Sequence, residues 1–166
     1  TIIGAGSFFT QQLVIDIANI QGMDEVTIGL VDIDENRLNI AKQLVEKVIE
    51  VSKKNWTIIA SIDRTEILSN SNFVINQIEV AGLKTVKYEY EIPLKYGVKQ
   101  CIGDTMGPGG LFKTLRTLPS WLEIVKDIEK YCPNSIILNY TNPMSAVTLA
   151  TVRSTSIPVV GLCHSI

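Results

Sequence analysis

Six short runs of apolar and β-branched residues, separated by segments of helical character, constrain the fold of this chain more than any other feature. Such alternation is typical of βαβ units, in which each run becomes a strand of a parallel sheet. The runs are Thr1–Ile3, Val26–Val31, Thr57–Ala60, Phe73–Gln77, Ser135–Asn139 and Pro158–Leu162. We therefore predict an α/β fold of the Rossmann type, a doubly wound, mainly parallel sheet with helices on both faces.

The segments between these runs predict three helices. The first spans about residues 10–20. The second follows Asp34, which suits an N-cap, and continues to about residue 52 with apolar residues at a spacing of 3.6. The third covers about residues 111–131. A long connection over residues 80–110 ends in a flexible glycine- and proline-rich loop, and connections of that length are usually functional.

A glycine-rich turn, residues 4–9, follows the first predicted strand and precedes the first predicted helix. In such turns the first glycine permits a tight bend and the second lets the backbone approach a pyrophosphate. Phe9 stands where the strict motif has a third glycine, and Asp32 follows Gly6 by 26 residues. An acid there accepts hydrogen bonds from the ribose of NAD and repels the 2′-phosphate of NADP. We predict that the cofactor is NAD and that its ligands include Gly4, Gly6, Ser7, Phe8 and Asp32.

An alternative remains for this turn, in which the glycines only fit a tight loop and Asp32 is a turn residue. Similar pairs of interpretations apply to two later polar positions. Asn142 either faces a substrate or caps the helix that Pro143 begins. Asp104, in the loop 103–110, either binds sugar hydroxyls or caps a turn.

Cys163 and His164 directly follow the last run, which has the composition of a buried strand, and His164 is the only histidine of the chain. The carboxyl edge of a parallel sheet is where ligands bind, so both are candidate site residues. Neighbouring residues of a strand point to opposite sides, so the two share one metal ion only if the strand has already ended. A buried cysteine is also commonly a small apolar residue.

Composition narrows the class of protein. The chain has 166 residues, enough for one domain, and a net charge of −2 without a basic stripe, so nucleic acid is not an expected partner. No apolar run is long enough to span a bilayer, and we expect no membrane partner. Cys101, Cys132 and Cys163 are an odd number of cysteines at wide spacings, which argues against a disulfide framework and favours a reducing, cytoplasmic location. The absence of an initial Met suggests the amino-terminal part of a longer protein.

Taken together, these residues resemble family 4 of the glycoside hydrolases, the NAD- and divalent-metal-dependent glycosidases, most closely the melibiase-type α-galactosidases and the related α-galacturonidases. The resemblance covers essentially the whole chain. The blocks that carry it are Ile3–Ser7, Val31–Asp34, Gly103–Gly110, Leu115–Thr117, Asn139–Met144 and Gly161–Ser165.

The resemblance implies a fold, a reaction and several residue roles. Bound NAD⁺ would take a hydride from C3 of the sugar, a base would remove the C2 proton, and the aglycone would leave by elimination before water adds and the hydride returns. Cys163 would bind a Mn²⁺-like ion that stabilises the enediolate. Asn139 would contact the cofactor, and Asn142 and Asp104 would contact the substrate, Asn142 beside the metal in the catalytic centre. His164 would be a catalytic acid, in a position that favours an unphosphorylated glycoside.

The same resemblance implies that residues 1–166 form the NAD-binding domain of a longer enzyme. The second metal ligand, the catalytic base and the carboxyl-terminal catalytic and oligomerisation domain would lie beyond Ile166, so the fragment alone should bind NAD without hydrolysing glycosides. The full-length enzyme is expected to self-associate. An α-galactoside is the favoured small-molecule substrate. An α-galacturonide, whose carboxylate Lys99, Lys113 or Arg116 could pair with, and an α-glucoside are alternatives.

Two functions outside this family remain open on the residues alone. A 2-hydroxy acid dehydrogenase of the lactate/malate type shares the sheet and an Asn-Pro pair after a late strand, but it would consume its nicotinamide stoichiometrically and need no metal. A non-catalytic NAD-binding module would use the glycines and Asp32 while Cys163 merely packs.

Overall fold

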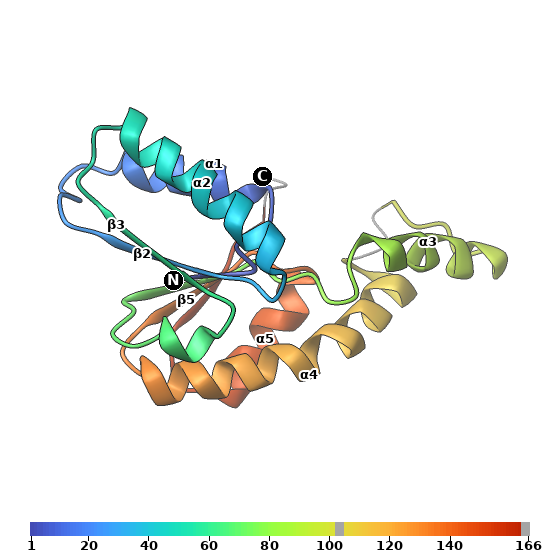
Figure 1. Cartoon of the computed structure of the whole chain (residues 1–166). Helices are drawn as coiled ribbons and strands as arrows, with labels where there is room; N and C mark the ends of the chain where they lie inside the picture. The colour runs from blue at the N-terminus through green and yellow to red at the C-terminus, as the bar shows by residue number, and fades with distance from the viewer. Residues whose placement is uncertain (102–104, 164–166) are drawn as a thin grey trace.

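The sheet is fully parallel and has the strand order β3-β2-β1-β4-β5-β6 in the computed structural model, which describes residues 1–101 and 105–163 (Figure 1). Each observed strand lies within one residue of its predicted bounds at either end. The strands are β1 (Ile2–Ile3), β2 (Thr27–Val31), β3 (Thr57–Ser61), β4 (Phe73–Asn76), β5 (Ile136–Asn139) and β6 (Val159–Gly161). The order reverses between β1 and β4, so the carboxyl ends of these two strands flank the switch point at which doubly wound sheets bind ligands.

Helices cover both faces of the sheet, as predicted. Helices α1 (Phe9–Ala18) and α2 (Glu35–Val51) pack together on one face, and α4 (Gly107–Tyr131) and α5 (Met144–Ser154) pack together on the other (Figure 1). Asp34 is the N-cap of α2, as predicted, and its carboxylate accepts a hydrogen bond from the amide of Arg37 at 3.1 Å. No helix in the described part of the chain has the length and apolar character needed to cross a membrane.

Each face of the sheet has its own hydrophobic core. Val14 and Val45 lie in the core beneath α1 and α2, whereas Trp121 and Val147 lie in the core beneath α4 and α5. The indole N–H of Trp121 is satisfied within this second core because it donates to the hydroxyl of Thr151 at 2.8 Å. Ala5 of the glycine turn belongs to the first core and Ile3, two residues before it, to the second, so the turn is supported from both faces of the sheet.

The glycine- and proline-rich cluster belongs to a helix and is not the flexible loop predicted from its composition. Residues 107–110 form the first turn of α4, four residues before the predicted start. Proline is compatible with this position because the first amides of a helix have no intrahelical acceptor. Gly110 is needed there, since a Cβ would lie 2.7 Å from the carbonyl carbon of Thr105.

A helix inside the long connection was missed by the sequence interpretation. Helix α3 (Val86–Lys95) follows the short 3-10 helix η2 (Leu83–Thr85), and Pro93 lies within it. It extends beyond the sheet and packs against the amino-terminal end of α4 (Figure 1). A further 3-10 helix, η1 (Arg64–Glu66), follows β3.

Strand β6 is not the buried strand that its apolar composition predicted. Among residues 1–101 and 105–163 it lies at one edge of the sheet and pairs with β5 alone, and Val160 is exposed. The backbone nevertheless stays tied to the sheet beyond the strand, because the amide of Leu162 donates to the carbonyl of Asn139 at 2.9 Å.

Candidate functional site at the carboxyl edge of the sheet

The glycine turn after β1 fits closely against the ends of two neighbouring strands. The amides of Gly4 and Ala5 both donate to the carbonyl of Val31 at 2.9 Å, which ties the turn to the end of β2. Gly4 has a φ of +82°, and a Cβ on it would lie 2.8 Å from the carbonyl oxygen of Gln77 beyond β4. Only glycine therefore satisfies both the backbone conformation and the contact at this position.

Asp32 anchors the second glycine of the turn. Its Oδ2 accepts a hydrogen bond from the Gly6 amide at 2.7 Å, and its Oδ1 accepts one from the Asp34 amide at 3.0 Å. The residue is 9% exposed. Arg37 closes the arrangement from α2, donating from Nη2 to the Gly6 carbonyl at 2.9 Å. Asp32 thus has the turn role considered from the sequence, and its remaining lone pairs still lie at the switch point, where a ribose could use them.

Ser7 and Phe8 lead from this turn into α1. The Ser7 hydroxyl accepts from the Phe9 amide at 3.3 Å, and Phe8, the N-cap residue, is 98% exposed. The start of α1 therefore has an apolar side chain in solvent and no side-chain cap at Phe8. Helix N-termini of this kind are suited to anion binding when a backbone turn such as this one precedes them.

Two residues that were not among the predicted site residues, Gln77 and Thr10, hold the glycine turn in place by hydrogen bonds. Gln77 donates from Nε2 to the Thr10 hydroxyl at 2.5 Å, and Thr10 donates in turn to the Ala5 carbonyl at 2.7 Å. The Oε1 atom of Gln77 is buried and has no hydrogen-bond partner among residues 1–101 and 105–163. Sequence reasoning placed Gln77 at the end of a strand but had no signal for its pairing with a threonine 67 residues away.

The carboxyl ends of β4 and β5 are joined by buried amides. Asn76 and Asn139 are aligned in the sheet register, both are fully buried, and Asn76 donates from Nδ2 to Asn139 Oδ1 at 2.8 Å. Asn139 Nδ2 then reaches the Thr141 carbonyl at 3.3 Å. Because Asn139 is buried, it can affect cofactor binding only indirectly, by fixing the conformation of the loop that follows β5.

Asn142 is half-buried in that loop and is joined to Pro143 by a cis peptide bond. The N-cap of α5 is Pro143, so the interpretation of Asn142 as the helix cap is wrong. Thr141, the residue before it, donates from its hydroxyl to the carbonyl of Ile78 at 3.1 Å. The loops that follow β4 and β5 are thereby held side by side.

Two ion pairs lie where these loops meet α3 and α4. Lys113 Nζ lies 2.7 Å from Glu79 Oε2, and Arg116 pairs with Glu89 on α3. Arg116 also donates from Nε to the Val80 carbonyl at 3.2 Å. Lys113 and Arg116, considered as partners of a uronate, are both engaged by carboxylates of the chain itself, whereas Lys99 is exposed.

Cys163 is exposed, two residues beyond the end of β6. No group of three or more histidine, cysteine, aspartate or glutamate side chains able to hold a metal ion occurs among the described residues. The other two candidates, Asp104 and His164, lie outside the residues that the structure describes. Of the three predicted site residues Asp104, Cys163 and His164, the structure therefore describes Cys163, the predicted metal ligand.

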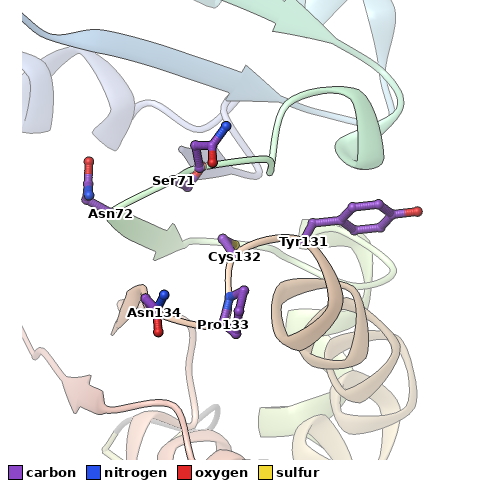
Figure 2. Close-up of a pocket in the computed structure, with 7 residues that line it drawn as sticks. Ser71, Asn72, Tyr131, Cys132, Pro133 and Asn134 are labelled. Atoms are coloured by element: carbon purple, nitrogen blue, oxygen red, sulfur yellow. The ribbon is translucent and has the colours of Figure 1, made fainter.

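A separate pocket of about 250 Å³ lies at the opposite edge of the sheet, before β4 and β5 begin (Figure 2). It is lined by Asn70, Ser71, Asn72, Tyr131, Cys132, Pro133 and Asn134. Burial raises the pKa of the Cys132 thiol, which makes this cysteine less reactive than an exposed one. The pocket is thus distinct from the glycine turn and contains none of the predicted site residues.

The parallel sheet, its strand order and the glycine turn at the switch point define an α/β domain of the Rossmann type, the predicted fold class. Comparison with known proteins defines the family. Residues 1–166 match the model of the Family 4 glycosyl hydrolases, and the chain belongs to this family, as its motifs indicated.

Relatives in this family act on different sugars. An alpha-galactosidase of Bacillus subtilis (strain 168) is 40% identical over 168 residues, covering 100% of this chain and 39% of that protein. A probable 6-phospho-beta-glucosidase of the same organism is 43% identical over 169 residues, covering 98% of this chain and 37% of that protein. The chain thus spans less than two-fifths of the length of these curated relatives, and alpha-galacturonidases also occur among them.

The fold also matches a solved structure with bound ligands. The 6-phospho-beta glucosidase of Thermotoga maritima, solved with manganese, NAD⁺ and glucose-6-phosphate, superposes with a TM-score of 0.83 at 33% identity. The match covers 99% of this chain and 39% of that one. The structures agree over the domain described above, so the glycosidase family and the Rossmann-type fold are established together.

Proposed function

We propose that this chain is the NAD-binding domain of a family 4 glycosidase that hydrolyses α-galactosides, with residues 1–166 as one domain of a longer enzyme. The observation that carries the proposal is the shared sheet edge. The glycine turn anchored by Asp32, the asparagine-rich ends of β4 and β5 and the end of β6 at Cys163 all lie at the carboxyl ends of parallel strands. A nucleotide and a sugar can meet at such an edge.

The residues of the turn fit a dinucleotide. A Cβ at Gly6 would meet Asp32 Oδ2 at 2.8 Å, so the backbone has no room for a side chain on that side of the turn. The buried and unpartnered Gln77 Oε1 supplies an acceptor that a bound hydroxyl or amide could satisfy. We infer that Gly4, Gly6, Ser7 and Phe8 bind the pyrophosphate side of NAD while Asp32 accepts from its ribose. When bound, NAD⁺ supplies reversible hydride transfer.

The metal site is proposed with one ligand from the described residues, the Cys163 thiolate. A soft thiolate at the carboxyl edge suits a divalent ion, but the donors that complete the set are not among the described residues. Asn142 is proposed as a substrate contact because it follows the loop segment fixed by Thr141. The roles of Asp104 as a sugar ligand and of His164 as a catalytic acid stay predictions from the motifs.

The α-galactoside assignment is supported by relatives that carry that activity and by the position of His164, which favours an unphosphorylated glycoside. The structure adds that Lys113 and Arg116 are already paired with Glu79 and Glu89. An α-galacturonide or α-glucoside is the alternative substrate. A cytoplasmic location and self-association of the full-length protein stay predictions.

The test uses the full-length protein with NAD⁺, Mn²⁺ and a reductant against a panel of nitrophenyl glycosides. We expect turnover of the α-galactoside without net formation of NADH. Accumulation of NADH with a 2-hydroxy acid would instead indicate the dehydrogenase, and NAD binding without turnover of any glycoside would indicate a non-catalytic module.

The metal ligand is tested by substitution. Cys163→Ser should weaken Mn²⁺ binding by at least about tenfold, because serine is a poor replacement for a thiolate ligand. Cys101→Ser, at another exposed cysteine, serves as the matched control and should leave Mn²⁺ affinity unchanged. Equal Mn²⁺ affinities in the two variants would exclude Cys163 as a ligand.

A further inference from the structure

The segment that follows β4 is fixed at both ends by hydrogen bonds to its backbone. The amide of Ile78 donates to Asn76 Oδ1 at 3.3 Å, and the carbonyl of Ile78 accepts from Thr141 at 3.1 Å. On the other side, the carbonyl of Val80 accepts from Arg116 at 3.2 Å. Glu79 lies between these two points, so its side chain projects from a rigid backbone.

The sheet register places Glu79 beside the proposed substrate contact. Asn76 and Asn139 are register partners in β4 and β5. Glu79 comes three residues after the first and Asn142 three residues after the second, and the bond between Ile78 and Thr141 joins the two loops one residue earlier. Glu79 and Asn142 therefore emerge at equivalent places on adjacent loops.

The ion pair with Lys113 is asymmetric. The Lys113 side chain is 3% exposed, whereas that of Glu79 is 33% exposed, so the carboxylate is the end of the pair that faces solvent. Oε2 lies against Lys113, and Oε1 has no hydrogen-bond partner within the described chain. The buried ammonium of Lys113 contacts Oε2 from the protein side, so this ion pair fixes the orientation of the carboxylate.

The neighbouring pair has the opposite arrangement. Glu89 is buried, and Arg116 uses Nε for the Val80 carbonyl while its Nη2 pairs with Glu89. Gln100 also contacts this group, donating to the Glu89 carbonyl at 2.9 Å. These contacts fix α3 on α4. The Arg116–Glu89 pair is thus structural, and of the two carboxylates Glu79 is the one that remains accessible.

We propose that Glu79 is a specificity-determining residue for the sugar, with Lys113 as its positioning residue. Its carboxylate accepts hydrogen bonds from neutral hydroxyl groups and disfavours sugars that bear a phosphate or carboxylate at that place, because like charges repel in a partly desolvated site. This inference rests on the proposed function, since it assigns an uncharged glycoside to the same edge.

The experiment compares kcat/KM of the full-length enzyme for nitrophenyl α-galactoside, its 6-phosphate and nitrophenyl α-galacturonide. In Glu79→Gln we expect kcat/KM for the neutral sugar to fall about 10- to 100-fold, as for loss of a charge-assisted hydrogen bond. For the two anionic sugars, kcat/KM should fall less than this or should rise. The ratio of kcat/KM for the neutral sugar to kcat/KM for each anionic sugar therefore falls at least about tenfold. Glu89→Gln is the matched control, and it should lower the melting temperature and leave this ratio unchanged.

A double variant, Glu79→Gln with Lys113→Met, removes both charges of the ion pair and keeps the test available if the single variant folds poorly. It should show the same fall in ratio. If either variant binds NAD as wild type does and its neutral-to-anionic ratio of kcat/KM stays within about threefold of wild type, the role of Glu79 is overturned. The glycosidase assignment is not affected by that result. A wild-type preference for an anionic sugar overturns the α-galactoside assignment itself, together with the role of Glu79.

Discussion

The amide of Gly6 donates a hydrogen bond to the carboxylate of Asp32, 26 residues further along the chain, at 2.7 Å. This contact connects the turn after β1 to the end of β2 and gives Asp32 a place in the structure before any ligand binds. The same carboxylate accepts from the Asp34 amide at the start of α2. One side chain therefore aligns the turn, the strand end and the second helix at the proposed cofactor site.

Replacing Asp32 by Asn should weaken both the fold and the NAD site. The side-chain NH2 of Asn cannot accept from a backbone N–H, so one of the two bonds to Gly6 and Asp34 is lost and its donor is left unpaired. We expect a loss of about 1–3 kcal/mol in the free energy of unfolding and at least a tenfold rise in the Kd for NAD. Denaturant unfolding and calorimetric titration measure the two effects.

Asp34→Asn is the matched control for that substitution. Asn is as good an N-cap as Asp, and its side-chain oxygen can still accept from the Arg37 amide. Stability and NAD affinity should both stay near wild type. An NAD affinity in Asp32→Asn equal to that in Asp34→Asn would show that the acidic anchor is not needed by the cofactor site.

Comparing Gly4→Ala with Gly22→Ala separates the cost of a positive φ from the cost of a steric clash between the new Cβ and the neighbouring backbone. Both glycines have nearly the same positive φ, +82° and +81°, but a Cβ at Gly22 meets nothing within 4 Å. Gly22→Ala should cost about 1 kcal/mol from strain alone. Gly4→Ala should cost at least about 2 kcal/mol more because its Cβ would overlap the Gln77 carbonyl, and it should abolish measurable NAD binding.

Thermal unfolding with and without NAD checks this pair of variants. NAD should raise the melting temperature of wild type and of Gly22→Ala but not that of Gly4→Ala, since ligand binding to the native state is what stabilises it. Equal stabilisation of all three proteins by NAD would contradict the placement of the cofactor at the turn.

The sequence alone was sufficient for the strands, and the reason is local. Most of the runs that became β1 to β6 have a glycine, proline or polar residue beside at least one end, which marks that end without knowledge of the fold. Helix α3 was missed because Pro93 lies inside it and its surroundings depend on α4, which the chain reaches later. The start of α4 was misplaced for a related reason, since glycine and proline near Gly107 suggest a loop until Thr105 packs against Gly110.

The sequence was sufficient to predict the motifs of the site but not the hydrogen bonds between its side chains. The spacing of Gly4, Gly6 and Asp32 indicated a nucleotide turn, and the structure brings these residues together. The bonds of Gln77 to Thr10 and of Asn76 to Asn139 join residues more than 60 positions apart. Only the strand order determines which of these side chains meet, so a sequence pattern could mark the edge of the sheet without revealing its internal support.

Asn139 and Asn142 should respond differently to substitution by Ala. Asn139→Ala leaves the buried Asn76 amide without its acceptor and should lower the free energy of unfolding by about 2–3 kcal/mol. Asn142 is half-buried, and no side-chain hydrogen bond of it occurs within the described residues, so Asn142→Ala should change stability by less than about 0.5 kcal/mol. Its effect should fall on kcat/KM for the glycoside. A stable, fully active Asn142→Ala enzyme would remove this residue from the site.

Alkylation kinetics of the three cysteines provide a test of the metal site that does not depend on turnover. The thiolate is the reactive form, and burial raises the pKa of Cys132, so at neutral pH a maleimide should modify exposed Cys101 and Cys163 well before Cys132. Mn²⁺ added with NAD should slow the modification of Cys163 and leave the rate at Cys101 unchanged, because only a metal-bound thiolate is protected.

Peptide mapping by mass spectrometry gives the rate of modification at each cysteine. Equal rates at Cys163 with and without Mn²⁺, at a concentration that supports turnover, would mean that the end of β6 does not hold the metal.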